Sequence, residues 1–405
     1  MHPAIVADLS MPPAVVNPST DRATDDATAA ALAAPAGGTP PPRPGGGSNG
    51  AFFDVRMLPA GHGDCLWIEY GDNAATHRLL IDGGTQASAT GLLKHVGALP
   101  EHDRQFELLV LSHIDSDHIG GALPLLKTVA QGLRFGDVWF NGWRHLSGQL
   151  GSKQGEMFSS AIEDLHLPWN AWRQGHAIVV DGDDLPATIL PGGMKLTLLS
   201  PTPAQLAKLA PAWQQELKQA GLVAGAHIDY SRFLKGSPST STDVDKLAET
   251  PFDGDAAPAN GSCIAVLAEF GGASVLFGAD AHDPVLRESV RKLLRKRGID
   301  RLKLDALKVS HHASQNNLSK DLLALIDCKR YCISTNGDYF CHPDREAIGR
   351  IIKYGGARPE LSFNYLSRYN EVWKRPDLQE RFGYSARYPE KVEEGVVLTL
   401  LAANR

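Results

Sequence analysis

The sequence predicts an α/β fold, and three observations support this prediction. Short apolar runs of strand length recur after residue 51 and are separated by turn residues. Two of these runs, 78–81 and 108–111, are almost entirely apolar, which is typical of strands in a sheet that is covered on both faces. Apolar residues at helical spacing follow the second run, so strands and helices alternate along the chain.

The composition indicates a folded protein. The chain has 405 residues, of which 43% are hydrophobic and 21% are charged, and its formal net charge is −6. A disordered chain contains fewer hydrophobic residues, and a protein that coats nucleic acid carries a large basic excess. The length allows one large domain or two.

The first fifty residues differ in composition from the rest of the chain. They contain 11 Ala, 9 Pro and 6 Gly, and no Phe, Trp or Tyr. Such a segment cannot bury enough apolar surface to offset the entropy that it would lose on ordering. We therefore predict a disordered tail over 1–50 and a folded domain over 51–405, with an insertion at about 141–260.

The first part of the domain is expected to consist mainly of strands. Apolar runs bounded by turn residues predict strands at 53–58, 65–70, 78–81, 108–111 and 137–140. The spacing of Leu123, Leu126, Val129 and Leu133 predicts a helix before the last of these strands.

The later elements are predicted in the same way. Strands are expected at 195–199, 263–269, 274–278, 306–309, 330–334 and 396–401, and helices at 155–165, 203–220, 284–297, 319–326 and 344–354. Gly271 and Gly272 indicate a hairpin turn between two of the strands. The polar stretch 235–260 is expected to be a long loop, and such loops are usually functional or disordered.

The strongest functional signal follows the predicted strand 108–111. Within six residues the chain presents His113, Asp115, Asp117 and His118. Imidazole and carboxylate groups are ligands of zinc, manganese and iron, and four of them at one strand end would repel or clash without a cation between them. The alternative is a polar loop in which aspartates cap the next helix. This alternative would explain any one of these residues taken alone, but it does not explain all four together.

Two later strand ends carry similar groups. One predicted strand is followed by Asp280, and another by His311 and His312. An aspartate placed between two cations can bridge them, and a pair of cations activates water for attack on a phosphoryl or acyl centre. Taken alone, Asp280 is better explained as the cap of the next helix, but the motif at 113–118 favours the metal role.

Together these motifs resemble those of metallo-β-lactamase-fold hydrolases, and more narrowly the nuclease-like C-terminal domain of bacterial DNA-uptake (competence) channel proteins and its free-standing relatives. The matching segments, in the order of that family, are Gly61-His-Gly-Asp64, Leu80-Ile-Asp-Gly-Gly84, Ser112-His-Ile-Asp-Ser-Asp-His-Ile-Gly-Gly121, Gly278-Ala-Asp280, Val309-Ser-His-His-Ala-Ser314 and His342-Pro343. The resemblance covers about residues 53–354. It implies an αββα four-layer sandwich of two mixed sheets with outer helices.

The resemblance also implies a centre with two divalent metal ions, zinc first, with manganese or magnesium as alternatives. The implied ligands are His113 and Asp115 for one ion, Asp117 and His118 for the other, Asp280 as a bridge, and His311 as the last ligand of the second ion. Asp82 and Asp64 would support the ligands from behind, as such sites require.

The residues implied to act on the substrate surround this centre. Asp117, His312 and His342 are the candidate catalytic residues, and one of the two histidines would protonate the leaving group. Asn316, Asn260 and Ser262 are the candidate substrate-binding residues. A helix-capping or core role is the alternative for His342.

The sequence departs from the superfamily pattern at two points. Many members have a histidine in place of Asp115, and a further histidine ligand between the central motif and the bridging aspartate. His145, His166, His176 and His227 lie in that interval, but none of them follows a convincing strand. An oxygen-rich first site would shift the preference from zinc toward manganese or magnesium.

Three functional hypotheses follow. The first is a metal-dependent hydrolase that uses a metal-bridging hydroxide as a phosphodiesterase or nuclease, on a nucleic acid or a nucleotide. The second is a hydrolase of a non-phosphate ester, lactone or amide, with a substrate pocket covered by tryptophans in and beside the insertion, which are Trp139, Trp143, Trp169 and Trp172. The third is a non-catalytic metal-binding interaction module, which predicts lost ligands.

Two further features bear on partners and location. Residues 287–303 contain eight basic and two acidic residues, which would attract a phosphodiester or form a solvated helix face.

The five cysteines are irregularly spaced, and no run reaches the roughly 18 apolar residues of a membrane helix. We therefore expect a cytoplasmic protein without a membrane partner. Cys65 opens an apolar strand, so we expect it to be a core residue rather than a nucleophile.

Overall fold

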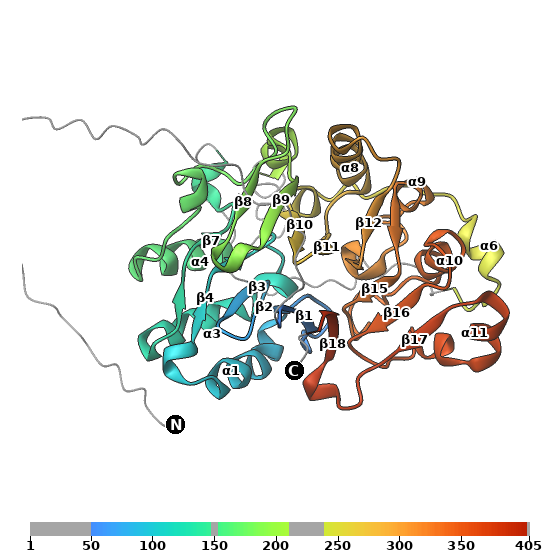
Figure 1. The fold of residues 1–405 in the computed structure, drawn as a ribbon, viewed down its shortest axis with the longest axis horizontal. Coiled ribbons are helices and arrows are strands. Elements are labelled where there is room, and N and C mark those ends of the chain that lie inside the picture. Colours follow the sequence, from blue (N-terminus) through green and yellow to red (C-terminus); the bar gives the residue numbers. More distant parts are fainter. Residues whose placement is uncertain (1–49, 147–152, 210–238, 403–405) are drawn as a thin grey trace, which may run out of the picture. The chain divides into compact units, whose positions relative to one another are not determined.

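Two mixed β-sheets packed face to face form the centre of the fold (Figure 1). The computed structural model describes residues 50–146, 153–209 and 239–402. These residues belong to one compact unit, Ser48–Arg405. Except for Gly50, the tail that we predict over 1–50 lies outside the described residues, as do His227 and positions 210–220 of the predicted helix 203–220.

The first sheet contains six strands in the order β18-β1-β2-β3-β5-β7. They are β1 (Phe52–Met57), β2 (Leu66–Gly71), β3 (Thr76–Ile81), β5 (Leu108–Val110), β7 (Val138–Trp139) and β18 (Val396–Leu401). The pairs from β18 to β3 are antiparallel, whereas β3, β5 and β7 run parallel. All six strands are predicted from their apolar runs, and the ends agree within two residues.

The second sheet contains eight strands in the order β17-β16-β15-β13-β11-β10-β9-β8. They are β8 (Ala187–Ile189), β9 (Lys195–Ser200), β10 (Ala265–Phe270), β11 (Ala273–Phe277), β13 (Ala306–Lys308), β15 (Arg330–Ile333), β16 (Glu360–Phe363) and β17 (Ser385–Arg387). The sequence predicts the five from β9 to β15 in chain order. It misses β8 and β17, which are three-residue edge strands with exposed positions, and β16, whose sequence Glu-Leu-Ser-Phe is not an apolar run. Two short ladders, β4 (Gln105–Phe106) with β6 (Arg134–Phe135) and β12 (Leu302–Leu304) with β14 (Ile326–Cys328), complete the strands.

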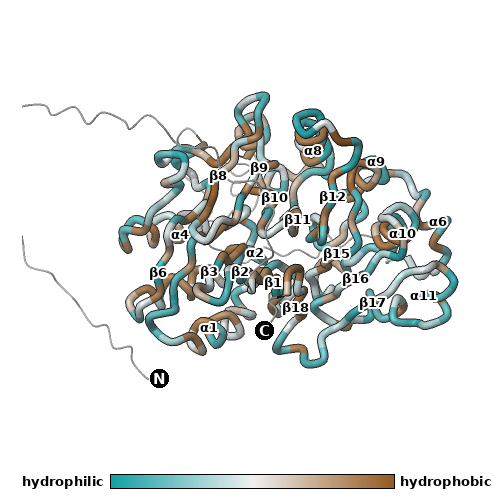
Figure 2. Tube along the Cα trace, viewed as in Figure 1, coloured by the Kyte–Doolittle hydropathy of each residue, from teal (hydrophilic) through white to brown (hydrophobic). Residues whose placement is uncertain are grey.

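Helices cover the outer face of each sheet, so the fold is the predicted αββα sandwich. The first sheet is covered by α1 (Ala89–Ala98), α3 (Ala122–Leu126) and α4 (Lys153–Asp164), whose apolar residues pack on the strands. The second is covered by α6 (Val244–Ala248), α8 (Asp283–Arg297), α9 (Lys320–Ala324), α10 (Arg345–Tyr354) and α11 (Pro376–Phe382). A third apolar cluster fills the space between the sheets. In Figure 2 the hydrophobic segments follow the strands, and the hydrophilic segments lie mainly in peripheral loops.

Two helix predictions and one loop prediction are wrong in detail. The helix expected around 123–133 consists of α3 followed by a 3-10 helix, Lys127–Gln131, which ends at Gly132 with φ 90°. The described part of the loop expected at 235–260 contains α6 and α7 (Pro258–Gly261). Here Asp243 caps the first of these helices, and the proline stands at the first turn of the second, where its missing N–H costs nothing. The predicted helix 319–326 stops at Ala324 because the strand β14 begins two residues later.

The two sheets meet at one edge, where strand ends from both lie close together. Backbone hydrogen bonds join the sheets there, from Ile264 N to Ser112 O at 2.9 Å and from Asn336 N to Gly61 O at 2.9 Å. The predicted functional motifs follow the strands β3, β5, β11 and β13 at this edge. None of the helices in the described ranges combines the length and the apolar character of a membrane span.

Candidate metal centre

Asp82, which directly follows β3, organises the loop that carries the central motif. Its carboxylate accepts hydrogen bonds from the backbone N–H and the hydroxyl of Ser112, both at 2.7 Å, and from Nδ1 of His118 at 2.8 Å. The side chain is fully buried. Because a carboxylate can only accept here, the hydrogen of His118 is on Nδ1, and the lone pair of Nε2 points away from Asp82.

Two more imidazoles are oriented in the same way. The hydroxyl of Ser112 donates to Asp82 and therefore accepts from Nδ1 of His113, at 2.9 Å. Nδ1 of His312 donates to the carbonyl of Ser334 at 2.7 Å. In both rings the lone pair is therefore on Nε2. The Nε2 atoms of all three histidines are buried and have no hydrogen-bond partner, an arrangement that is costly in a folded core unless a cation binds there.

These nitrogens converge on Asp280. Its Oδ2 atom lies 3.4 Å from Nε2 of His118, 3.6 Å from that of His312 and 3.9 Å from that of His113. The carboxylate itself is 3% exposed, and its Oδ1 has no hydrogen-bond partner. Asp280 therefore stands at the centre of the group, where the sequence analysis places the bridging carboxylate.

Asp117 adds a second carboxylate on the side of His312. Its Oδ2 atom lies 3.4 Å from Nε2 of His312 and 3.8 Å from Nε2 of His118. The potential ligand atoms form overlapping groups, each within 4.8 Å: His113, His118 and Asp280 in one, and Asp117, His118 and His312 in another. Asp280 also belongs to a further group, with Asp64 and His312, and a carboxylate shared by two groups can bridge neighbouring cations.

His311 and His312 occupy different places from those expected from the resemblance. His312 is fully buried and belongs to the convergent groups, although the sequence analysis places it on the substrate side. His311, the expected ligand, directs Nε2 toward Asp280 at 3.8 Å and stays 18% exposed. Both residues have positive φ, 47° and 54°, a conformation that is rare outside glycine and that clusters at functional sites.

Asp115 lies at the rim of the site. Its side chain is 42% exposed, and Oδ2 is 3.3 Å from Nε2 of His113. The carboxylate is thus near the first group of ligands but is held less firmly than Asp117 or Asp280.

A network of polar side chains behind His311 is missed by sequence reasoning. Nδ1 of His311 donates to Asn317 Oδ1 at 2.9 Å, and Asn317 donates to Asp255 at 2.9 Å. Asn260 donates to the same carboxylate at 2.7 Å. Asn260, a candidate substrate-binding residue, therefore supports His311 from behind. No strand end marks Asp255 in the sequence, because it lies in the irregular stretch before α7.

The other candidate substrate residues differ in their surroundings. The hydroxyl of Ser262 is buried and donates to Ala259 O at 2.6 Å, which is a local bond at the end of α7. Asn316 is partly exposed. His342 is buried, its Nδ1 lies 3.1 Å from Asp344 Oδ1, and its ring centroid is 5.4 Å from that of His311.

Behind His312 lies a buried ion pair. Asp64 contacts the ammonium group of Lys308, and both side chains are at most 1% exposed. Asp64 Oδ1 is also 3.4 Å from Nδ1 of His312. Burial raises the pKa of Asp64, but Lys308 and His312 outweigh burial and hold it at about 2. The pair thus places a permanent carboxylate beside the imidazole.

The electrostatics of the centre favour a bound positive charge. Burial raises the pKa of Asp280, yet the imidazoles around it, His312 first, hold it well below its usual value. Burial lowers the pKa of His312, but Asp280 and Asp64 outweigh burial and raise it to about 9. Without a metal ion this negative site holds protons on its imidazoles, and a cation of suitable charge would displace them.

The donor set fits divalent metal ions. Three buried imidazole nitrogens with free lone pairs and two buried carboxylates suit zinc, manganese or iron. His145, His166 and His176 do not join any group of potential ligands in the part of the chain that the structure describes. No third-motif histidine is found there, so the first group contains two imidazoles rather than three.

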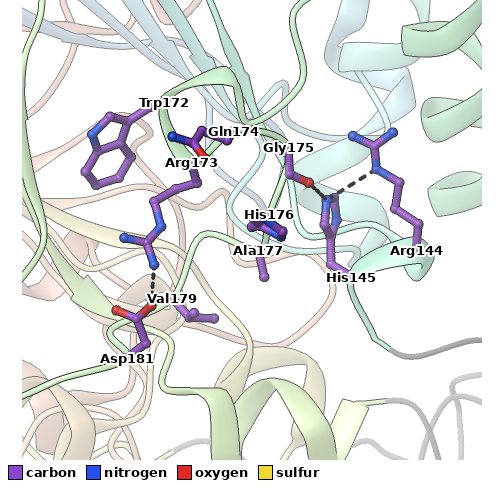
Figure 3. Close-up of a pocket in the computed structure, with 10 residues that line it drawn as sticks. All are labelled: Arg144, His145, Trp172, Arg173, Gln174, Gly175, His176, Ala177, Val179 and Asp181. Atoms are coloured by element: carbon purple, nitrogen blue, oxygen red, sulfur yellow. Dashed lines mark hydrogen bonds and ion pairs between the residues drawn. The ribbon is translucent and has the colours of Figure 1, made fainter.

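A cavity of about 840 Å³ is lined by residues between Arg144 and Asp181, and none of the candidate metal ligands is among them (Figure 3). Its wall includes His145, whose Nε2 is 3.2 Å from Gly175 O, and burial lowers the pKa of this imidazole to about 4. Ala177 and Val179 of the wall pack in the same apolar cluster as Ile114 of the central motif. The arginines of the cavity are paired, Arg173 with Asp181 and Arg144 with Glu163, so their charge is largely balanced.

Several basic residues of α8 also pair with carboxylates. Lys296 pairs with Asp184 at 2.6 Å, and Arg297 pairs with Glu269 at 2.8 Å. Arg287 contacts Asp283 and Asp321 at 2.7 and 2.8 Å. These contacts favour the solvated helix face over an attractive patch for phosphodiesters.

Comparisons with known proteins concern the fold. A search among curated proteins gave no match. Among solved structures, the chain is similar to the metallo-beta-lactamase fold protein YhfI from Bacillus subtilis, with 14% identity, coverage of 86% of this chain and 99% of that chain, and a TM-score of 0.42. Human tRNase Z, short form, has 9% identity, the same coverages and a TM-score of 0.40. Zn(2+)-bound PqqB from Methylobacterium extorquens has 11% identity, coverages of 85% and 99%, and a TM-score of 0.37.

All three TM-scores lie below 0.5, so nothing about activity is transferred from these proteins. The family match is independent of them and includes the segment with Asp64, Asp82 and the central motif. Residues 58–205 match the model of the Metallo-beta-lactamase superfamily, and the chain has the four-layer sandwich of that superfamily.

Proposed function

We propose that this protein is a metal-dependent phosphodiesterase or nuclease with two divalent metal ions, zinc first and manganese or magnesium as alternatives. The observation that carries the proposal is the set of buried, unpartnered Nε2 atoms on His113, His118 and His312 around Asp280. Bound divalent ions would supply Lewis acidity, activate water and neutralise charge on a phosphoryl group.

The residues of the chain have distinct parts in this proposal. His113, His118, His312, Asp117 and Asp280 hold the ions, and Asp82 fixes the orientation of two of the imidazoles through its bonds to His118 and Ser112. Asp115 contributes at the exposed rim.

Two histidines lie on the substrate side of this set. His311, partly exposed beside Asp280, contacts the substrate or completes the second ion site. His342 is the proposed proton donor to the leaving group, with Asp344 beside its Nδ1 to orient the ring. Burial lowers the pKa of His342 although Asp344 opposes this effect, so the ring gives up a proton more readily once it is protonated.

A phosphodiester is preferred to another ester because the motifs Val309-Ser-His-His-Ala-Ser314 and His342-Pro343 resemble those of the nuclease-like proteins. Two cations at short spacing clamp the attacking and leaving oxygens of an in-line displacement at phosphorus. The tryptophans expected to cover an ester or lactone pocket do not favour the second hypothesis. Among those whose side chains the structure describes, Trp139 and Trp169 are buried in the apolar core, and Trp172 alone lines the cavity in Figure 3. The five cysteines are unpaired in the structure, which is consistent with the cytoplasmic location that we keep in the proposal.

The test is turnover by metal-supplemented protein of bis(p-nitrophenyl) phosphate, p-nitrophenyl acetate and a β-lactam. We expect cleavage of the phosphodiester, its loss with chelator, and its loss in Asp117→Ala. Activity on the acetate or the lactam alone would replace the proposal with the second hypothesis. Metal binding without turnover of any substrate would favour an interaction module.

A further inference from the structure

An exposed aromatic side chain lies at the edge of the metal centre. Phe340 is large and apolar, yet it remains 38% exposed. Its ring centroid is 6.3 Å from that of His311 and 6.0 Å from that of His342. His311 in turn lies 3.8 Å from Asp280. The exposed ring of Phe340 is therefore separated in space from the candidate metal ligand Asp280 by the side chain of His311.

Phe340 belongs to a group of three rings, which we name the aromatic platform: His62, Tyr339 and Phe340. His62 stacks on Tyr339 with a centroid distance of 4.9 Å and meets Phe340 edge to face at 5.7 Å. Tyr339 and Phe340 meet edge to face at 4.5 Å. The platform joins the segment before Asp64 to the segment before His342, two of the motifs that carry the site.

The backbone of the platform is held in place before any ligand binds. Asn336 N donates to Gly61 O at 2.9 Å, and Cys341 N donates to Gly337 O at 3.1 Å. Gly337 has φ 80°, and a Cβ atom there would lie 2.2 Å from the ring of Tyr369, so no other residue fits. A rigid ring loses little entropy when it binds a ligand, which favours affinity.

We infer that Phe340 and the aromatic platform bind a nucleobase of the substrate by stacking, so that the substrate is a nucleotide or a nucleic acid rather than a simple phosphodiester. The inference rests on the proposed function. Within one nucleotide, only a sugar separates the base from the phosphate, and here only His311 separates Phe340 from Asp280. The flat base of a nucleotide can stack on the aromatic platform while the phosphate of the same nucleotide contacts the metal ions. Because every base has a π-face, such stacking tolerates any sequence.

The experiment compares two substrates that differ only in their bases: the dinucleotide TpT, and its abasic counterpart with tetrahydrofuran in place of both nucleosides. We expect kcat/KM to be about tenfold higher for TpT in the wild type, because base stacking on an aromatic ring contributes about that factor. Phe340→Ala should remove this preference, mainly through KM, while cleavage of the abasic substrate stays unchanged. Phe340→Trp should preserve it.

Ile189→Ala is the matched control, because Ile189 is an exposed apolar residue of the edge strand β8 and is 70% exposed. It should leave the ratio of the two substrates unchanged. Equal loss on both substrates in Phe340→Ala, or an unchanged TpT preference, would overturn the inference and leave the proposed function intact. If neither substrate is cleaved, the proposed function fails. Equilibrium binding of TpT and the abasic compound then decides: a preference lost in Phe340→Ala supports the platform, and equal binding overturns it.

Discussion

Asp82 accepts the Nδ1 hydrogen of His118 at 2.8 Å, although 36 residues separate them in the chain. This bond decides which nitrogen of His118 faces the candidate metal centre. A neutral imidazole carries one hydrogen, so a hydrogen held on Nδ1 leaves a lone pair on Nε2. The carboxylate that directly follows β3 thereby prepares a ligand on the short helix α2 (Ser116–Ile119), which follows β5.

Asp82→Asn should lower the affinity for the metal ion. The amide can still accept from Ser112 N–H, but its NH₂ group would face Nδ1 of His118 and favour the opposite tautomer, with the hydrogen on Nε2. Loss of such a supporting contact typically lowers metal affinity about 10- to 100-fold. Competition with a chromophoric zinc chelator measures the change.

Asp137→Asn is the matched control for this measurement. Asp137 is a buried carboxylate beside β7 that accepts the indole N–H of Trp139 and the backbone N–H of Ala171. Its replacement should lower the melting temperature without changing zinc affinity. Equal affinities for wild type and Asp82→Asn would contradict the orienting role of Asp82.

His312→Ala and His311→Ala should differ in their metal content. His312 has a buried Nε2 within 3.4 Å of Asp117 and 3.6 Å of Asp280, whereas His311 is partly exposed and its Nε2 is 3.8 Å from Asp280. We expect His312→Ala to bind about one ion fewer per chain, and His311→Ala to keep its ions but lose turnover. Elemental analysis after equilibrium dialysis distinguishes the two. The reverse order of metal loss would restore His311 as the ligand that the resemblance implies.

The central motif could be predicted from sequence because its candidate ligands lie within six residues of one another, just after one apolar strand. The network at Asp255 could not, because its place depends on distant contacts. The guanidinium of Arg350 in α10 donates to Thr250 O at 2.9 Å and to Leu318 O at 3.0 Å, which fixes the segments leading to Asp255 and Asn317. Nothing in the sequence around position 255 records this dependence.

The αββα fold was predictable where strands are apolar on both faces and less so at the sheet edges. β10 and β11 lie inside the second sheet and carry long apolar runs. β17, with the sequence Ser-Ala-Arg, pairs with β16 at the edge and is mainly exposed, so hydrophobicity does not mark it. The different surroundings of His311 and His312 also needed the structure, because both follow the same strand and only backbone conformation separates their positions.

The stability of the metal-free protein should fall as the pH rises from neutral toward 9. The pKa of His312 is raised to about 9 by Asp280 and Asp64, against about 6.5 in an unfolded chain. A raised pKa contributes stability that is fully present below pH 6.5 and is lost as the pH passes 9. The contribution of this one group is about 3 kcal/mol at most.

Thermal melts at pH 6.5, 7.5, 8.5 and 9.5 in the presence of chelator test this expectation. His312→Ala should flatten the decline, since the titrating group is gone. Saturating zinc should also flatten it, because a bound cation replaces the proton at every pH in the series. A decline of the same size in wild type and His312→Ala would assign the pH dependence to other groups.

Lys308→Met should strongly destabilise the protein, and a second substitution should relieve the effect. Lys308 and Asp64 form an ion pair in which both side chains are at most 1% exposed. Removal of the lysine alone leaves a buried carboxylate without its partner, which typically costs about 3–5 kcal/mol of unfolding free energy. In the double variant Lys308→Met with Asp64→Asn no unpaired charge remains, so we expect the free energy of unfolding to recover by several kcal/mol. Urea denaturation of the wild type, both single variants and the double variant gives the coupling energy.

The exposed pair of Lys391 with Glu394 serves as the control, and Lys391→Met should change stability by no more than about 0.5 kcal/mol. Additive effects at Lys308 and Asp64 would show that the two side chains are not coupled. In that case Asp64 would lack the partner that keeps it charged beside His312, and the origin of the raised pKa of that imidazole would have to be sought in Asp280 alone.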